Sequence, residues 1–148
     1  MTKQEVQAVT KYGPYRSFTN GDLETYNGVL DGSKQDFQFF FKNGKLVRIA
    51  VDLYEGQNLA TAAAEWLTLY KWMNAQFGPI ESPGSDPPTG SGAVFQGVEQ
   101  VIVKAGGEPQ MAPMNQPNDA FVYASLGHYE VQGKAYYIVF LHFDPPHA

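Results

Sequence analysis

Two segments of the chain read Lys11-Tyr12-Gly13-Pro14-Tyr15-Arg16-Ser17 and Gln76-Phe77-Gly78-Pro79-Ile80-Glu81-Ser82. In each, an aromatic residue, Gly and Pro are followed by a Ser, and each segment lies between a helical pattern and a strand pattern. A glycine just past a helix can adopt the left-handed conformation that closes it, and the proline behind it cannot continue the helix. The repeat therefore predicts two similar helix-then-strand units.

Helical patterns precede both segments. Residues 3–11 begin at a capping box, in which the Thr2 hydroxyl accepts from the Glu5 amide and the Glu5 carboxylate accepts from the Thr2 amide. Residues 59–77 follow the candidate N-cap Asn58 and carry apolar residues at three- and four-residue intervals. These apolar residues are Leu59, Ala62, Ala63, Trp66, Leu69, Tyr70, Met73 and Phe77. We expect the second helix to anchor the fold.

The strongest hairpin signal is Asn43-Gly44, which lies between the β-prone runs of residues 36–54. Regular strands on both sides of a two-residue turn would place on one face Phe37, Phe39, Phe41, Leu46, Arg48 and Ala50. The other face would carry Phe40, Val47, Ile49, Val51 and Leu53. Because both faces are largely apolar, we expect both to be covered.

A second hairpin closes the chain, with strands over residues 120–130 and 134–143 and Val131 paired with Lys134. One face then forms a core set of Val122, Ala124, Leu126, Val139, Leu141 and Phe143. The other face collects Tyr123, Tyr129, Tyr136, Ile138, Phe140 and His142. Two interpretations stay open for this second face: it is covered by a loop such as residues 106–119, or it is a protein-binding surface. The candidate partner-binding residues are Tyr123, Tyr129, Tyr136, Phe140 and His142.

The whole pattern predicts an α+β fold of two helix-then-antiparallel-sheet units, residues 1–56 and 57–148, in one compact body. Between the helix of the second unit and the closing hairpin we expect a mobile loop over residues 83–92, a strand over 93–104 and a long connection over 106–119.

Composition and motifs argue against several functions. A net charge of −5 disfavours nucleic acid and anionic lipid, and no apolar run is long enough to span a membrane. The absence of cysteine excludes disulfides and thiolate chemistry.

The sequence motifs point to no metal site, cofactor or catalysis. His128 and His142 are expected on opposite faces, so we predict no metal site. No nucleotide-binding or hydrolase motif suggests a cofactor or catalysis. Acids such as Glu24 and Asp52 could meet in space, but solvated surface acids are the default interpretation.

The N-terminal part carries a resemblance in Met1-Thr2-Lys3-Gln4-Glu5-Val6, in Tyr12-Gly13-Pro14 and in Phe39-Phe40-Phe41-Lys42-Asn43-Gly44-Lys45-Leu46-Val47-Arg48-Ile49. These segments resemble the Gly-Met-Thr-x-x-x-Val, Leu-Gly-x-Pro and Phe-x-x-Gly-Lys-Leu pattern of the small outer-membrane assembly lipoproteins. The repeated plan is also similar to that of the β-lactamase inhibitor proteins, which are built from two such units. The chain departs from both families because it has neither a lipid-bearing cysteine nor disulfides.

The resemblance implies a periplasmic or secreted protein of the bacterial envelope that works by contact with a protein partner and not by catalysis. An aromatic concave sheet grips the target in the inhibitor proteins, and the tyrosine-rich face would be its counterpart here. The alternative is a binder of small apolar ligands, with a pocket between the 58–77 helix and a sheet. A hydrolase built from dispersed acids is a third reading, and a cytoplasmic location stays open.

Overall fold

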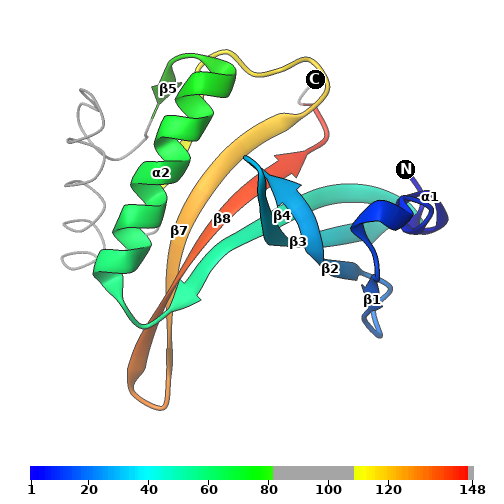
Figure 1. The fold of residues 1–148 in the computed structure, drawn as a ribbon, viewed down its shortest axis with the longest axis horizontal. Helices are drawn as coiled ribbons and strands as arrows, with labels where there is room; N and C mark the ends of the chain where they lie inside the picture. Colours follow the sequence, from blue (N-terminus) through cyan, green and yellow to red (C-terminus); the bar gives the residue numbers. More distant parts are fainter. Residues whose placement is uncertain (82–108, 147–148) are drawn as a thin grey trace.

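The computed structural model describes residues 1–81 and 109–146, which form one curved antiparallel sheet with a long helix against it (Figure 1). The strand order is β1-β2-β3-β4-β8-β7-β6-β5. The helical elements are α1 (Lys3–Gln7), the 3-10 helix η1 (Thr10–Tyr12) and α2 (Leu59–Phe77). The strands are β1 (Arg16–Ser17), β2 (Leu23–Leu30), β3 (Ser33–Lys42), β4 (Lys45–Gly56), β5 (Ile80–Glu81), β6 (Gln110–Pro113), β7 (Phe121–Val131) and β8 (Lys134–Asp144).

The prediction of an α+β fold made of two tandem helix-then-sheet units is wrong. In residues 1–81 and 109–146, the strands of both halves belong to one eight-stranded sheet, because β4 pairs directly with β8 from Ile49↔Phe143 to Gly56↔Tyr137. Among the described helical elements, only α2 is long. The helix expected over residues 3–11 is limited to the five residues of α1, which buries Val6 alone and gives too little apolar surface to organise a unit of its own.

The two aromatic-Gly-Pro segments end their helical elements differently. Gly78 follows α2 with φ +80°, a conformation that favours glycine, and its amide donates to Asn74. Gly13 follows η1 with φ −76° and ψ 174°, which is extended backbone that any residue adopts. The two segments are therefore not structural equivalents, although the local signals at the helix starts are confirmed. Thr2 and Glu5 form the capping box, and the Asn58 side chain accepts from the Thr61 amide.

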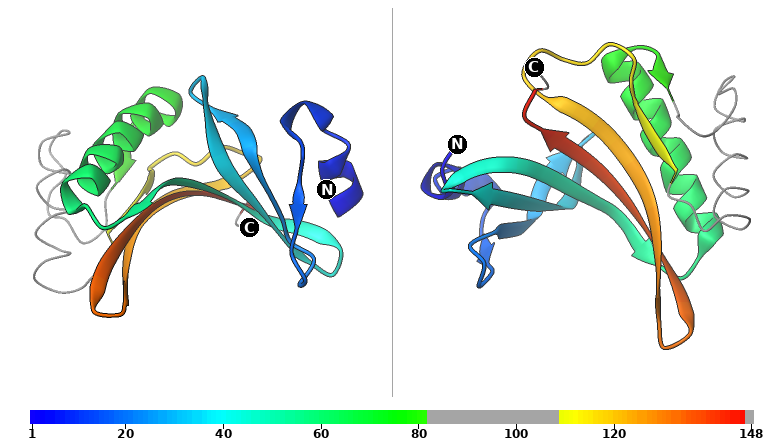
Figure 2. Two further views of the ribbon diagram at one scale, coloured as in Figure 1. Left: turned by 60° about the horizontal axis from the view of Figure 1, so that its bottom comes forward. Right: turned by 180° about the vertical axis from the view of Figure 1, so that it is seen from behind.

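The core lies between α2 and one face of the sheet. Trp66 and Met73 of α2 are fully buried against apolar side chains of β4, β6, β7 and β8, which include Val51, Met111, Leu126 and Leu141. Figure 2 shows that the long strands bend into an arch, with α2 on the outer, convex side. Among the described helices, none combines the length and hydrophobicity needed to cross a membrane.

The β3–β4 hairpin turns at Asn43-Gly44 as predicted, and both residues have positive φ. The predicted division of its faces is wrong. Phe41 pairs with Leu46, but Phe40 pairs with Arg48, so Val47 is an extra residue that opposes none in β3. This β-bulge changes which residues share a face, and Phe37 and Phe39 lie with Ile49 and Val51 on the convex face of the sheet.

The closing hairpin agrees with its prediction, since Val131 pairs with Lys134 and the expected core side chains face α2. The long connection expected over residues 106–119 is only partly correct. Its described portion contains β6, which pairs with β7 through Gln110↔Ser125 and Met111↔Ala124. A strand at this place extends the sheet sideways and does not cover its tyrosine-rich face. The loop expected over 83–92 and the strand expected over 93–104 lie outside the described residues.

Candidate functional site

The face of the sheet opposite α2 is the most distinctive surface of the molecule, and we call it the concave face. Among residues 1–81 and 109–146, no helix lies on the inner side of the arch (Figure 2). Strand pairing assigns the side chains of this face on five strands. They are Glu24, Asp36, Gln38, Phe40, Arg48, Ala50, Asp52, Glu55, Phe121, Tyr123, Ser125, Tyr129, Tyr136, Ile138, Phe140, His142 and Asp144.

The five residues proposed from the sequence as a partner-binding set all lie on the concave face. Tyr129 and Tyr136 are paired across β7 and β8, with ring centroids 5.4 Å apart and planes inclined by 9°. Tyr123 stacks on His142 at 4.6 Å, and Phe140 lies 5.4 Å from the same imidazole. Tyr129 is 38% exposed, whereas His142 is only 9% exposed. Tyr129 at the outer end of the hairpin is therefore accessible for contact, His142 is buried, and Tyr123, Tyr136 and Phe140 are half-buried.

Four carboxylates form a second group on this face, and we call them the carboxylate row: Glu24, Asp36, Asp52 and Glu55. Asp36 pairs directly with Asp52 across β3 and β4, and Glu24 pairs with the neighbouring Gln38. Asp52 and Glu55 are three residues apart and would point to opposite faces of a regular strand. Leu53 is bulged between the pairs Asp52↔Phe140 and Tyr54↔Val139, so both acids reach the concave face.

Burial and mutual repulsion disfavour ionisation of two members of the row. The pKa of Asp52 is raised to about 7, first by burial and then by the nearby charges of Glu55 and Asp36. The pKa of Asp36 is raised to about 6, first by burial and then by Glu24. The Tyr129 hydroxyl donates to Glu55, and this hydrogen bond raises the tyrosine pKa to about 12. Acidic groups are therefore crowded beside the stacked tyrosines, and Asp36 and Asp52 ionise fully only at a higher pH than an ordinary aspartate.

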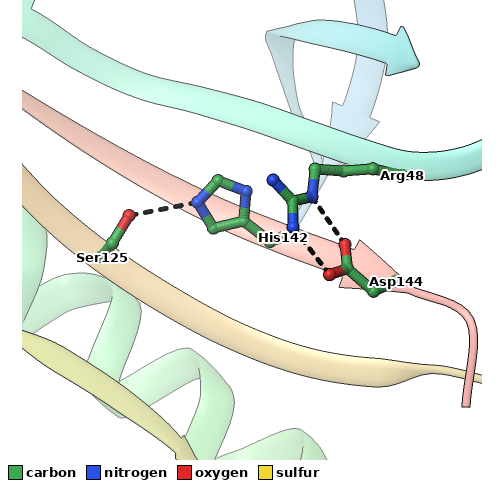
Figure 3. Close-up of polar contacts among 4 residues, drawn as sticks. All are labelled: Arg48, Ser125, His142 and Asp144. Carbon is green, nitrogen blue, oxygen red and sulfur yellow. Dashed lines mark hydrogen bonds and ion pairs between the residues drawn. The ribbon is translucent and has the colours of Figure 1, made fainter. Parts of the chain in front are cut away.

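On the β7 and β8 part of the concave face, Ser125 and His142 form a hydrogen-bonded pair (Figure 3). The Ser125 Oγ lies 3.1 Å from the His142 Nε2, a distance compatible with a nucleophile and its base. Two features oppose that role. The buried Nδ1 has no partner among the described residues that could orient the ring, and burial, followed by Arg48, lowers the His142 pKa to about 4. Such an imidazole is a weak base at neutral pH.

Arg48 is held by Asp144 in a two-pronged contact (Figure 3). Its Nε donates to Oδ1 at 2.7 Å, and one terminal nitrogen donates to Oδ2 at 2.8 Å. The guanidinium also lies 5.8 Å from the centre of the Tyr123 ring. This ion pair joins β4 to the end of β8, and it leaves Arg48 engaged with an acid outside the carboxylate row.

Sequence reasoning found the aromatic half of the concave face but missed the carboxylate row as a group. It named Glu24 and Asp52 and treated them as solvated, whereas Glu24 is 5% exposed. The alternation of polar and apolar residues along β2 and β3 could have assigned Glu24 and Asp36 to the concave face of the sheet. No sequence signal placed the bulges at Val47 and Leu53 that bring the β4 acids to the same face.

An apolar cavity of about 260 Å³ lies between the α1–η1 segment and the convex face of β2, β3 and β4. Its walls include Val6, Val9, Tyr15, Phe37 and Phe39. The interface of α2 with the sheet, where a ligand pocket was predicted, is instead filled by fully buried side chains such as Ala63 and Trp66.

In the part of the chain that the structure describes, no three His, Asp or Glu side chains are arranged to hold a metal ion. Comparison with protein-family models, with curated proteins and with solved structures finds no match to this chain.

Proposed function

We propose that this chain is a noncatalytic protein-binding module and that its partner docks on the concave face. The observation that carries the proposal is the stacked pair Tyr129 and Tyr136 on a sheet face that no described helix covers. Tyrosine rings give large, rigid contact area with a hydrogen-bonding tip, and they are frequent among the residues that dominate binding energy at interfaces. The curvature of the sheet would allow this face to enclose a convex loop of a partner.

The polar groups of the concave face support contact in preference to chemistry. Ser125 and His142 meet, but the imidazole lacks an orienting partner among the described residues and is a poor base. The Arg48–Asp144 pair spans two strands and holds their geometry. These interactions make the inner end of the face rigid, and a rigid surface loses less conformational entropy when a partner binds.

Substitution of the two stacked tyrosines tests the proposal. The wild-type protein is used as bait in a cell-envelope extract, and a captured protein is identified, purified and titrated against wild type, Tyr129→Ala and Tyr136→Ala. We expect each substitution to weaken binding by about tenfold while the melting temperature changes little. Met114→Ala is the control, because Met114 is an exposed apolar residue outside the concave face. Unchanged affinity of both tyrosine variants would refute the proposed surface.

The periplasmic or secreted location is part of this proposal and is supported by the resemblance of residues 1–54 to envelope lipoproteins. Fractionation of cells that express the protein from its own gene tests it. Recovery in the cytoplasmic fraction would contradict an envelope role.

A second candidate function is the binding of a small apolar molecule, and the cavity beneath α1 and η1 favours it. Its volume of about 260 Å³ lies below the usual range of ligand pockets, about 300 to 1,000 Å³, so only a small ligand would fit. The fluorescent probe N-phenyl-1-naphthylamine tests it. Val9→Trp should fill the cavity and abolish probe fluorescence, whereas Val131→Trp at the exposed hairpin should not. Equal fluorescence of both variants would exclude the cavity as the site.

A further inference from the structure

Among the described residues, no ion pair links the carboxylate row to a cation, although Arg16 lies opposite Glu24 across β1 and β2. The ion pair found in residues 1–81 and 109–146 joins Arg48 to Asp144, and neither residue belongs to the row. The buried Oδ1 of Asp36 accepts no hydrogen bond. Like charges that face each other across antiparallel strands destabilise a sheet. No cation of the described chain forms an ion pair with Asp36 or Asp52, and a cationic donor supplied from outside the chain would reduce their mutual repulsion.

The shape of the row indicates which cation it suits. Its members lie on β2, β3 and β4, and neighbouring strands are about 4.8 Å apart. The carboxylates consequently extend along the sheet, and the described residues include no set that could converge on a metal ion. A guanidinium group is planar, and its several donors can bind two carboxylates at once.

Aromatic rings border the row. Tyr129 donates to Glu55 and stacks on Tyr136, while Phe140 pairs with Asp52 from the neighbouring strand. Arginine binds well where carboxylates and aromatic faces lie together, since its guanidinium stacks on rings while its edge donates hydrogen bonds. The charged groups that face Asp52 are Asp36 from β3 and Glu55 from β4, and both repel negative charge.

We propose that the partner of the concave face presents an arginine side chain to the carboxylate row, with Asp36 and Asp52 as acceptors and Tyr129 as the bordering ring. This inference rests on the proposed binding function and adds the chemistry of the partner. The chain carries a net charge of −5, so a basic partner is also favoured in the first encounter.

A peptide pair tests the inference without knowledge of the partner. The blocked peptide Ala-Ala-Arg-Ala-Ala and its counterpart with citrulline, a neutral isostere of arginine, are titrated into the full chain at about pH 8 and low salt, where the acids are ionised. NMR signals of the Asp and Glu carboxyl carbons and of the backbone amides report binding. We expect the arginine peptide to shift the signals of Asp36 and Asp52 and to bind about fivefold more tightly than the citrulline peptide.

Two variants complete the test. Asp52→Asn should weaken arginine-peptide binding by about fivefold, whereas Asp31→Asn, which removes the same charge from an exposed turn, should not. Equal binding of the two peptides, or shifts confined to α2, would overturn the inference.

The test also separates this inference from the proposed function. If binding of a captured protein depends on Tyr129 but not on Asp52, the arginine contact is wrong and the binding function stands. If the peptides behave as expected but no protein binds the concave face, the arginine site stands and the module function fails.

Discussion

Asp36 and Asp52 face each other directly across β3 and β4. A regular ladder continued from Phe41↔Leu46 would pair Asp36 with Val51 and turn Asp52 toward α2. The extra residue Val47 shifts the register by one and brings the two acids together on the concave face. The candidate site therefore depends on a backbone irregularity that lies several residues from the acids themselves.

Deletion of Val47 tests this account of the hairpin. Val47 opposes no residue in β3 and precedes the part of β4 that pairs with β8, so its removal leaves every pair of both ladders intact. We expect a loss of about 1 kcal/mol or less in the free energy of unfolding. Deletion of Ala50, which pairs with both Gln38 and His142, is the matched control and should prevent folding. Similar urea midpoints for the two deletions would contradict the assigned bulge.

The carboxylate row should make the protein less stable as pH rises. The pKa of Asp52 is raised from 3.8 to about 7, so the folded state binds more protons than the unfolded state between these values, and stability falls as pH rises through this window. After a discount for its partial exposure, Asp52→Asn should increase the free energy of unfolding at about pH 8 by about 1 kcal/mol. Urea titrations at about pH 5 and pH 8 measure this effect. Asp31→Asn should leave it unchanged, and a stability loss for Asp52→Asn would contradict the prediction.

His142 should have the opposite pH dependence. Its pKa is lowered from 6.5 to about 4, chiefly by burial, so it contributes stability above the unfolded value that is lost as pH falls through this window. We expect nitrogen NMR shifts of the imidazole to show a neutral ring at about pH 5.5, where an ordinary histidine is mostly charged. As pH falls, the free energy of unfolding of His142→Phe should decrease less than that of the wild type. A titration midpoint near the ordinary value would place the ring in solvent.

Trp66 should be the most sensitive position of α2. It is fully buried in the core, and Trp66→Ala is expected to lower the free energy of unfolding by about 3 to 5 kcal/mol. Trp72 only borders the core, where it contacts Phe77 with ring centroids 5.9 Å apart. Trp72→Ala is therefore the matched control, with a smaller loss expected. Denaturant unfolding of the two variants compares them, and equal losses would argue against α2 as the anchor of the fold.

The candidate site was predictable in part. The tyrosine-rich half follows from the Gln132-Gly133 turn and from strict alternation along regular strands, so all five predicted residues share the concave face. The carboxylate half was not predictable, because β4 contains the two bulges at Val47 and Leu53. With a side-chain period of two, each bulge moves the following residues to the other face relative to a regular strand.

The sequence by itself determined the elements whose signals act over a few residues. Asn58 and the apolar spacing determined α2, and Asn43-Gly44 and Gln132-Gly133 determined the turns of two hairpins. Only the tertiary structure decided that β4 pairs with β8 to make one sheet, and that Asp36, Asp52 and Glu55 share a surface. Caps, helix periodicity and turns are governed by local geometry, whereas strand order and bulges are chosen by the burial and pairing of residues that are far apart in the chain.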